Sequence, residues 1–303
     1  MGLPKIITII GANASGKSSM GIELATAFNG EIISADSRQI YRGFDLCCGK
    51  VTAEEAQMVP HHLLDIIDIG DPFSVYEYQK MAYFLIPQIL SENKIPFIVG
   101  GTGLYVQSVV EGYNFQESSI DISLRNKLEL LSIDELQVML NFEDKRDLNA
   151  SDLQNKRRLI RRIEKNTLGE SLETENVPIY DALQLGIRWS KEVLHQRIDE
   201  RLNTRIEQGM INEVKTYLDN GGCQEHLYNL GLEYRHILWY LVGKYQSLDE
   251  FKLEMAREIK RFAKRQMTWF RGIEAIHWID MSEKNYMEQA NQLIAGYLGK
   301  QKG

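Results

Sequence analysis

Close to its first residue the chain contains a residue pattern that is typical of phosphate binding. The pattern G-x-x-x-x-G-K-S follows the apolar segment 6–10 directly. Glycines let the backbone curl around phosphate oxygens, and the N–H groups that open the next helix point at the anion. Lys17 would reach the terminal phosphate and Ser18 would ligate Mg²⁺. The pattern predicts a pyrophosphate site, and the alternative is a glycine-rich turn that only connects strand to helix. The residues expected to bind the diphosphate are Gly11, Ala12, Asn13, Ala14, Ser15, Gly16, Lys17 and Ser18.

A second group of functional side chains follows the expected strand 31–34. Asp36, Ser37, Arg38 and Gln39 place an acid, a hydroxyl, a guanidinium and an amide side by side. Such a group suits recognition of a base or substrate, and the alternative is a helix start in which Asp36 or Ser37 only caps the following turn. A nucleotide hydrolase would normally carry a magnesium-binding aspartate at the end of an apolar strand. Segment 95–99 ends instead in glycine and threonine, which leaves Asp36 available for a role other than ATP cleavage.

Two helical segments gather positive charge in a chain whose net charge is −7. Like charges four residues apart on one helix repel each other, so such a helix often binds an anionic partner; the alternative is a solvated face with counterions. Together the two segments favour RNA, although the net charge argues against indiscriminate nucleic-acid binding. The first segment holds Lys156, Arg157, Arg158, Arg161, Arg162 and Lys165. The second holds Arg257, Lys260, Arg261, Lys264, Arg265 and Arg271, opposite an apolar stripe of Met255, Ile259 and Phe262 that we expect to face the core.

The remaining histidines, cysteines and aromatic residues favour structural interpretations over functional ones. His61 and His62 are adjacent, so on an extended segment they point to opposite faces, and packing is favoured over a metal pair. The three cysteines lack C-x-x-C spacing, which fits a reducing cytoplasm. No apolar run approaches the roughly 20 residues that span a bilayer, and residues 1–10 lack a signal-peptide cleavage pattern. We therefore expect a cytoplasmic protein. Four aromatic residues could stack on bases but are more often core: Trp189, Trp239, Trp269 and Tyr234.

Short apolar strands separated by helices must position these groups. This order predicts a parallel sheet with ligands at the carboxyl ends of its strands. The expected fold class is α/β: a P-loop NTPase-like parallel sheet core with helices on both faces and an inserted all-helical domain. We assign residues 1–114 and 180–303 to the core and 115–179 to the insertion, where helical, charge-rich segments begin at about Gln116. The expected strands are 6–10, 31–34, 95–99, 182–189 and 275–279, and the expected helices are 18–28, 74–92, 104–110, 191–218 and 248–270.

Six motifs, in order along almost the whole chain, resemble the tRNA dimethylallyltransferase family, bacterial type. They are Gly11 to Ser18, DSRQIY at 36–41, HHLLD at 61–65, VGGTGLY at 99–105, RLIR at 158–161 and AKRQMTW at 263–269. The resemblance implies a P-loop core with a helical insertion that binds tRNA. It further implies transfer of a dimethylallyl group from dimethylallyl diphosphate to N6 of the adenosine 3′ to the anticodon, with release of diphosphate. Mg²⁺ is the implied cofactor, and no obligate protein partner is evident.

The resemblance also assigns roles to single residues. Asp36 would accept a hydrogen bond or proton from N6 of the adenine, Thr102 would contact substrate near the reaction centre, and Lys17 would hold the leaving diphosphate. Arg235 would add a cation near that site. The anticodon stem-loop would be contacted by Asp36, Ser37, Arg38, Gln39, Thr102, Arg125, Arg157, Arg158, Leu159, Ile160 and Arg161.

The chain departs from the family pattern at four positions. Many members have proline and threonine where Ala12 and Asn13 stand, and relatives often carry an arginine at Leu230 and a glycine at Glu233. We therefore expect the diphosphate to be held with one charge fewer than usual. Three other functions compete with the favoured one: a P-loop small-molecule kinase, a prenyltransferase of free adenine nucleotides, and a noncatalytic RNA-binding protein in which Asp36 is only a cap.

Overall fold

The computed structural model describes residues 2–115, 121–141, 145, 148, 150–168 and 175–299. The chain divides into two compact units, of which the first comprises Met1–Gly112 with Pro178–Gly303 and the second Tyr113–Val177. Gln116, where we expected the helical segment to begin, lies outside the described residues.

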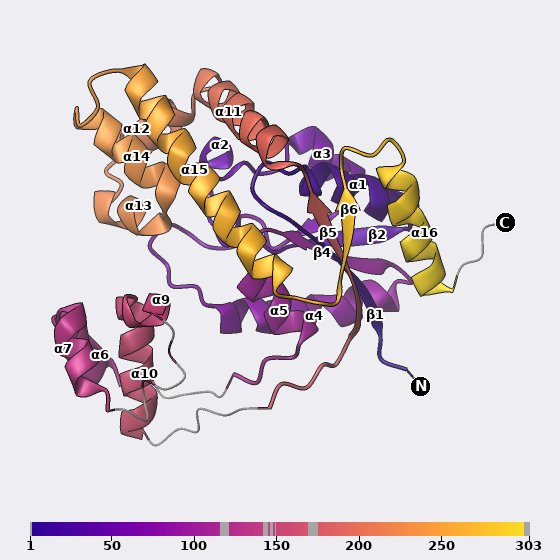
Figure 1. The fold of residues 1–303 in the computed structure, drawn as a ribbon, viewed down its shortest axis with the longest axis horizontal. Helices are drawn as coiled ribbons and strands as arrows, with labels where there is room; N and C mark the ends of the chain where they lie inside the picture. Colours follow the sequence, from indigo (N-terminus) through magenta and orange to yellow (C-terminus); the bar gives the residue numbers. More distant parts are fainter. Residues whose placement is uncertain are drawn as a thin grey trace. The chain divides into compact units, whose positions relative to one another are not determined.

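The first unit is built on a six-stranded parallel sheet in the order β3-β2-β4-β1-β5-β6 (Figure 1). The central strand, β1, pairs with β4 and with β5, so that Ile7 lies beside both Phe97 and Leu183. Its mostly apolar sequence, with four isoleucines in six residues, suits a strand that is covered on both faces. This result confirms the predicted α/β class with a parallel sheet. The strands are β1 Lys5–Ile10, β2 Gly30–Ser34, β3 His61–His62, β4 Ile95–Gly100, β5 Asp181–Arg188 and β6 Ile276–Asp280.

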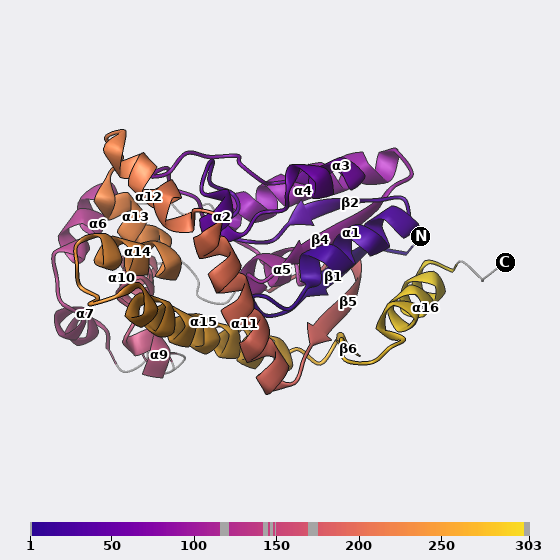
Figure 2. The ribbon, with the colours of Figure 1, turned by 90° about the horizontal axis from the view of Figure 1, so that it is seen from above.

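Helices cover both faces of this sheet. Alternation along β1 sends Ile6 and Ile10 into a core with α4 and α5, whereas Ile7 and Ile9 pack in a core with α1 and α16. Helices α11 to α15 gather on the side of the sheet where the loops after β1 and β2 emerge (Figure 2), and a third apolar core joins them to Ala12 and Ala14. The helices of this unit are α1 Lys17–Ala27, α2 Asp45–Cys48, α3 Ala53–Met58, α4 Val75–Ser91, α5 Gly103–Val110, α11 Lys191–Glu207, α12 Met210–Asp219, α13 Gln224–Leu230, α14 Leu232–Leu241, α15 Leu248–Arg271 and α16 Tyr286–Leu298.

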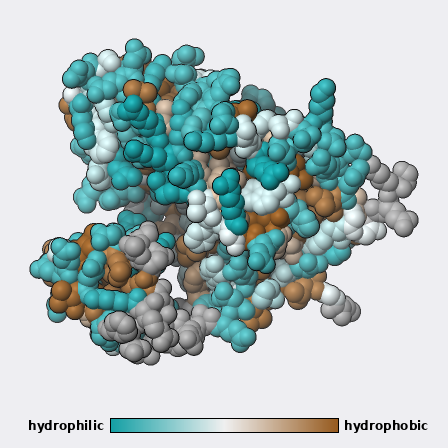
Figure 3. Space-filling model, viewed as in Figure 1, coloured by the Kyte–Doolittle hydropathy of each residue, from teal (hydrophilic) through white to brown (hydrophobic). Residues whose placement is uncertain are grey.

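Two expectations for these helices are wrong. The helix expected over 191–218 is two helices, because Gly209 adopts a φ of 106° between α11 and α12 and ends the first of them. Phe262 does not belong to the buried stripe of α15. That stripe runs through Met255 and Ile259 to Ala263, at the four-residue spacing of one helix face, and Phe262 is 39% exposed. The surface over α12, α14 and α15 is mostly hydrophilic (Figure 3).

The secondary structure in the described residues of the second unit consists of helices joined by short turns and loops. Its core is formed by Leu128, Leu136, Leu140, Leu159, Ile160 and Ile163. Ser132 starts one helix with a capping box, since its side chain accepts from the Glu135 amide while Glu135 reaches back to the Ser132 amide. The helices are α6 Ile122–Glu129, α7 Ile133–Met139, α9 Ala150–Leu153 and α10 Lys156–Leu168.

Among the residues that the structure describes, none of the helices combines the length and apolarity that a membrane crossing requires.

Candidate active site

The phosphate loop between β1 and α1 is held from outside by side chains of the returning chain. Arg197 Nε donates to the Ala14 carbonyl oxygen at 3.0 Å, and Trp189 Nε1 donates to the Ser15 carbonyl oxygen at 2.8 Å. Gly16 lies at φ 96° as the N-cap of α1. The first amides of a helix have no intrahelical acceptor. The first amides of α1 therefore point toward an anion site, while the Ala14 and Ser15 carbonyl oxygens accept from Arg197 and Trp189.

The residues of the loop differ in what they expose. Ala12, Ala14 and Ser15 are buried. Ser18 is half-buried at the start of α1. Lys17 is buried, with Nζ 3.5 Å from the Ala12 carbonyl oxygen.

Gln266 of α15 joins the phosphate loop to the end of β4. Its Oε1 accepts from the Asn13 amide at 2.9 Å, and its Nε2 donates to the Gly101 carbonyl oxygen at 2.8 Å. The sequence motif at 263–269 contains this residue, but no role was predicted for it. One side chain thus fixes the spacing between the two loops that carry Lys17 and Thr102.

The ends of β2 and β4 meet closely. A Cβ on Gly100 would lie 2.0 Å from the Ala35 carbonyl oxygen, so only glycine fits there. The Thr102 amide donates to that same oxygen at 3.1 Å, and Thr102 Oγ1 accepts from the Ser37 amide at 3.0 Å. Asp36 and Thr102 are therefore brought together, as expected for residues that follow neighbouring parallel strands.

Asp36 caps a turn and not a helix. Its Oδ1 accepts from the Arg38 amide at 2.9 Å, and residues 37–40 form a turn. The next helix, α2, begins only at Asp45, so the alternative that Asp36 or Ser37 starts a helix is wrong. Asp36 is half-buried and lines a cavity of the first unit. One carboxylate can thus hold the turn with Oδ1 and face the cavity.

This cavity has a volume of about 810 Å³, the size of a site for a small organic ligand. Polar groups and backbone line one part of it: Asn13, Asp36, Ser37, Arg38, Gly101, Thr102, Gly231, Glu233, Arg235 and Gln266. Rings line another: His236, Trp239, Tyr245, Phe262, Trp269 and Phe270. Of the aromatic residues considered from the sequence, Trp239 and Trp269 reach the cavity, Trp189 braces the loop and Tyr234 is core.

Three arginines that the sequence analysis missed add positive charge near the phosphate loop. Arg197, Arg201 and Arg205 stand four residues apart on α11, which places them on one face of that helix. Burial, together with Arg201 and Arg205, lowers the pKa of Lys17 to about 8, although Asp36 opposes the shift. Burial and Arg205 likewise lower the pKa of Arg201 to about 10. Their regular spacing within an expected helix was the available signal.

The structure shows where the residues that depart from the family pattern lie at the end of α13 and the start of α14. Leu230 is 5% exposed in the core shared by α11 to α15 and contributes no charge. Arg235 lines the cavity, with Nε donating to the Gly231 carbonyl oxygen at 3.2 Å and its guanidinium 5.6 Å from the Tyr228 ring centroid. Its role in holding diphosphate stays a prediction.

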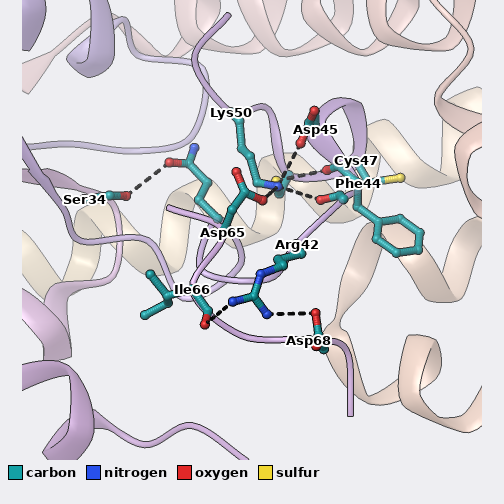
Figure 4. Close-up of polar contacts among 12 residues, drawn as sticks. Ser34, Arg42, Phe44, Asp45, Cys47, Lys50, Asp65, Ile66 and Asp68 are labelled. Carbon is teal, nitrogen blue, oxygen red and sulfur yellow. Dashed lines mark hydrogen bonds and ion pairs between the residues drawn. The ribbon is translucent and has the colours of Figure 1, made fainter. Parts of the chain in front are cut away.

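The segment that follows the Asp36 turn is fixed by polar contacts (Figure 4). Lys50 Nζ bonds both Asp45, at 2.8 Å, and Asp65, at 2.5 Å, while Arg42 bonds Asp68 at 2.9 Å. Gln39 is held between the Ser34 hydroxyl at 3.2 Å and the Gly49 carbonyl oxygen at 3.0 Å. Its amide therefore braces the segment, and the tRNA contact expected of Gln39 stays a prediction.

Acidic partners hold much of the basic helix in the second unit. Arg125 binds Glu164 through two nitrogens, each at 2.6 Å, and Arg161 lies 3.5 Å from the same carboxylate. Arg158 pairs with Asp152. The repulsion between like charges on this helix is therefore relieved in part by acids of the same unit. Arg157 is exposed.

Leu159 and Ile160, expected to contact tRNA, are 0% and 2% exposed. Their side chains form the core of the second unit because they lie on the inner face of α10. Side-chain contact with tRNA is therefore not their role.

Within the described residues, no group of three or more His, Cys, Asp or Glu side chains could hold a metal ion. His61 Nδ1 lies 2.7 Å from the Val59 carbonyl oxygen and His62 Nε2 lies 2.6 Å from Glu31, so the two histidines serve packing. Magnesium usually takes few protein ligands and completes its shell with substrate phosphates and water. The Ser18 hydroxyl beside the phosphate loop fits that arrangement.

Fold and loop together define a P-loop protein in which Asn13 of the loop and Asp36 line one cavity. The family model described as IPP transferase matches residues 39–273. The chain belongs to this family, which confirms the resemblance seen in the motifs.

Relatives match over nearly their whole length. The tRNA dimethylallyltransferase 2 of Shewanella sediminis is 42% identical over 296 residues, covering 96% of this chain and 97% of the relative. The tRNA dimethylallyltransferase of Bacillus velezensis is 38% identical over 300 residues, covering 95% of each. The solved tRNA isopentenylpyrophosphate transferase of Bacillus halodurans superposes with a TM-score of 0.73 at 35% identity, covering 98% of this chain and 97% of that one.

Proposed function

We propose that this chain transfers the dimethylallyl group from dimethylallyl diphosphate to the exocyclic N6 of the adenosine 3′ to the anticodon in tRNA, releasing diphosphate. The observation that carries the proposal is the junction made by Gln266, which holds the phosphate loop beside the loop of Thr102 and hence beside Asp36. A leaving diphosphate and an attacking amine need such adjacent sites. The names of relatives at about 40% identity support the same reaction.

The phosphate loop would bind the diphosphate as a leaving group. Negative charge grows on the oxygen that separates from the allylic carbon, and preorganised donors stabilise that charge. Lys17, the first amides of α1 and the arginines of α11 supply such donors. Bound at the Ser18 hydroxyl, Mg²⁺ would neutralise further charge on the diphosphate.

Asp36 would act on the nucleophile. An amine conjugated to a purine is a poor nucleophile, and a carboxylate that accepts one of its protons in the transition state strengthens it. Because Oδ1 of Asp36 holds the Arg38 amide, we assign the proton acceptance to Oδ2. Thr102 would fix the turn through Ser37 while contacting the substrate in the cavity that both residues line.

The tRNA would supply an adenosine that is already unpaired. Moving such a base into a cavity costs only a few kcal/mol. Basic side chains on α10 that bind loop phosphates can offset this cost, and exposed Arg157 is the residue best placed for such a contact, with Arg158 and Arg161 oriented by their acidic partners.

The test is to incubate purified protein with Mg²⁺, dimethylallyl diphosphate and unmodified tRNA, and to analyse digested RNA by mass spectrometry. We expect a prenylated adenosine that maps beside the anticodon. Parallel reactions contain AMP in place of tRNA, or ATP in place of the prenyl donor. Prenylated AMP without tRNA product would favour a nucleotide prenyltransferase, and ATP consumption without prenyl transfer would favour a kinase.

A further inference from the structure

The cavity that contains Asp36 extends along α15 beyond the residues of the proposed reaction. Gln266 contacts the loop of Thr102, whereas Glu258 lines the cavity about 12 Å further along the axis of the helix. We call the region around Glu258 the distal part of the cavity. It is lined by His236, Trp239, Tyr245, Glu254, Glu258 and Phe262. The reaction proposed above gives these residues no task.

We propose that the distal part of the cavity binds the base of a nucleotide next to the target adenosine in the RNA. The ring of Phe262 stacks on that base, and the Nε2–H group of His236 donates a hydrogen bond to an acceptor on its edge. Tyr245 is a positioning residue, because its hydroxyl holds the imidazole in the tautomer that carries this hydrogen. This inference rests on the proposed function, because it concerns the RNA substrate of that reaction.

The imidazole of His236 is fixed on one side and open on the other. The residue is 6% exposed, and its Nδ1 lies 2.8 Å from the Tyr245 hydroxyl oxygen. A phenol is a better donor than acceptor, so the hydroxyl donates to Nδ1 and the ring hydrogen resides on Nε2. Among the described residues Nε2 has no hydrogen-bond partner, and it does not belong to the nitrogen atoms sealed from solvent. His236 therefore presents a donor to a ligand in the cavity that it lines.

Phe262 presents an aromatic ring between the distal part and the reaction site. It stands four residues after Glu258 and four before Gln266, so the three side chains share one face of α15. The Arg265 guanidinium lies 5.7 Å from its ring centroid, and 39% of the residue remains exposed. Unpaired bases of RNA stack on accessible aromatic rings of this kind. Phe262 can therefore bind a base that lies beside the acceptor.

The groups around the imidazole favour a base over the other parts of the two substrates. An apolar prenyl group would cover the Nε2 donor without bonding it, which costs free energy. The charged groups near the imidazole are of both signs: Glu254, Glu258, Arg235 and Lys244. A phosphate matches only the two cations and is repelled by the two carboxylates. A base has a flat face for stacking and an edge that carries both acceptors and donors.

The test uses anticodon stem-loops in which the nucleotide on the 5′ or the 3′ side of the target adenosine lacks its base. On the intact stem-loop, Phe262→Ala should lower kcat/KM for RNA about 5- to 100-fold through lost stacking. His236→Leu should lower it about 3- to 10-fold through one lost hydrogen bond, and His236→Gln, whose amide donates instead, should recover most of that loss. KM for dimethylallyl diphosphate should not change. Phe84→Ala, which removes an exposed ring from α4, is the matched control.

Coupling to the neighbouring base decides the result. Removing the base on one side should slow wild type, and it should slow Phe262→Ala, His236→Leu and Tyr245→Phe by a smaller factor. Equal losses on all three RNAs overturn the inference, and so does a raised KM for dimethylallyl diphosphate in Phe262→Ala, which would assign the ring to the prenyl group. If His236→Leu does not fold, Tyr245→Phe and the exposed Phe262→Ala decide. An inactive wild type on the intact stem-loop would instead overturn the proposed function.

Discussion

The carboxylate of Asp36 holds the turn and would also accept a proton from the substrate, and one substitution separates these two roles. Asp36→Asn keeps an Oδ1 that accepts from the Arg38 amide, so the turn should persist. The amide cannot accept the proton of N6, and kcat should fall by about 10²- to 10⁴-fold while RNA affinity is retained. Single-turnover kinetics and RNA-binding titrations measure the two effects. Near-normal turnover would return Asp36 to a capping role alone.

The Lys17 ammonium couples diphosphate binding to protonation. Burial lowers its pKa to about 8, so that as pH rises through 8 the free protein loses the charge that attracts the anion. A bound diphosphate favours the protonated form and raises that pKa again. We therefore expect proton uptake on binding near pH 8, and affinity that weakens above it.

Calorimetry in two buffers of different ionisation enthalpy measures this uptake. Lys17→Arg, whose charge does not titrate in this range, is the control and should show no uptake from this position. Equal heats in both buffers for wild type would mean that Lys17 is not the titrating group.

At the scale of elements, α15 sets the relation between two loops. Replacing Gln266 by leucine leaves the Asn13 amide and the Gly101 carbonyl oxygen without partners, which should destabilise the protein by about 1 to 3 kcal/mol. Because both loops lose their anchor, kcat/KM should fall for donor and acceptor together. Thr268→Val, which removes only a hydroxyl bonded within α15, is the control. Thermal unfolding and steady-state kinetics test the prediction, and a change in RNA kinetics alone would contradict it.

How far the sequence predicts these elements depends on whether their signals are local. The phosphate loop, β4 and α4 are each defined by their own apolar pattern and turn residues, and their predicted bounds agree with the structure within a residue or two. The sequence places Asp36 and Thr102 after the ends of expected strands, and the structure brings the two residues together.

Features that depend on packing between distant segments escaped prediction. Gln266 and Arg197 contact the phosphate loop from more than 180 residues away in the sequence. No local pattern around either residue identifies its hydrogen-bond partner. Leu159 and Ile160 sit between arginines, so the motif obscured that they belong to the inward face of α10. Gly209 is a local signal for the end of a helix. The apolar pattern of 191–218 outweighed this signal in the prediction of one continuous helix.

At the scale of the whole molecule, a net charge of −7 coexists with local positive surfaces. Acidic partners neutralise much of that local charge: on α15, Arg257 pairs with Glu254 and Lys260 with Asp199. Under the proposed function, electrostatic attraction of RNA depends on those described cations that lack such partners, and on the ionic strength.

Arg157 tests this dependence. It is exposed on α10, and the structure gives it no ion pair among the described residues. If it binds a tRNA phosphate, Arg157→Ala should weaken tRNA binding and reduce the slope of log K against log salt by about one, because one fewer counterion is released. Lys127→Ala, which removes an equal charge from an exposed position on α6, separates a contact from a change in net charge. Equal effects of the two variants would mean that the second unit attracts RNA only through its overall charge, whereas a loss confined to Arg157 would place a phosphate at α10.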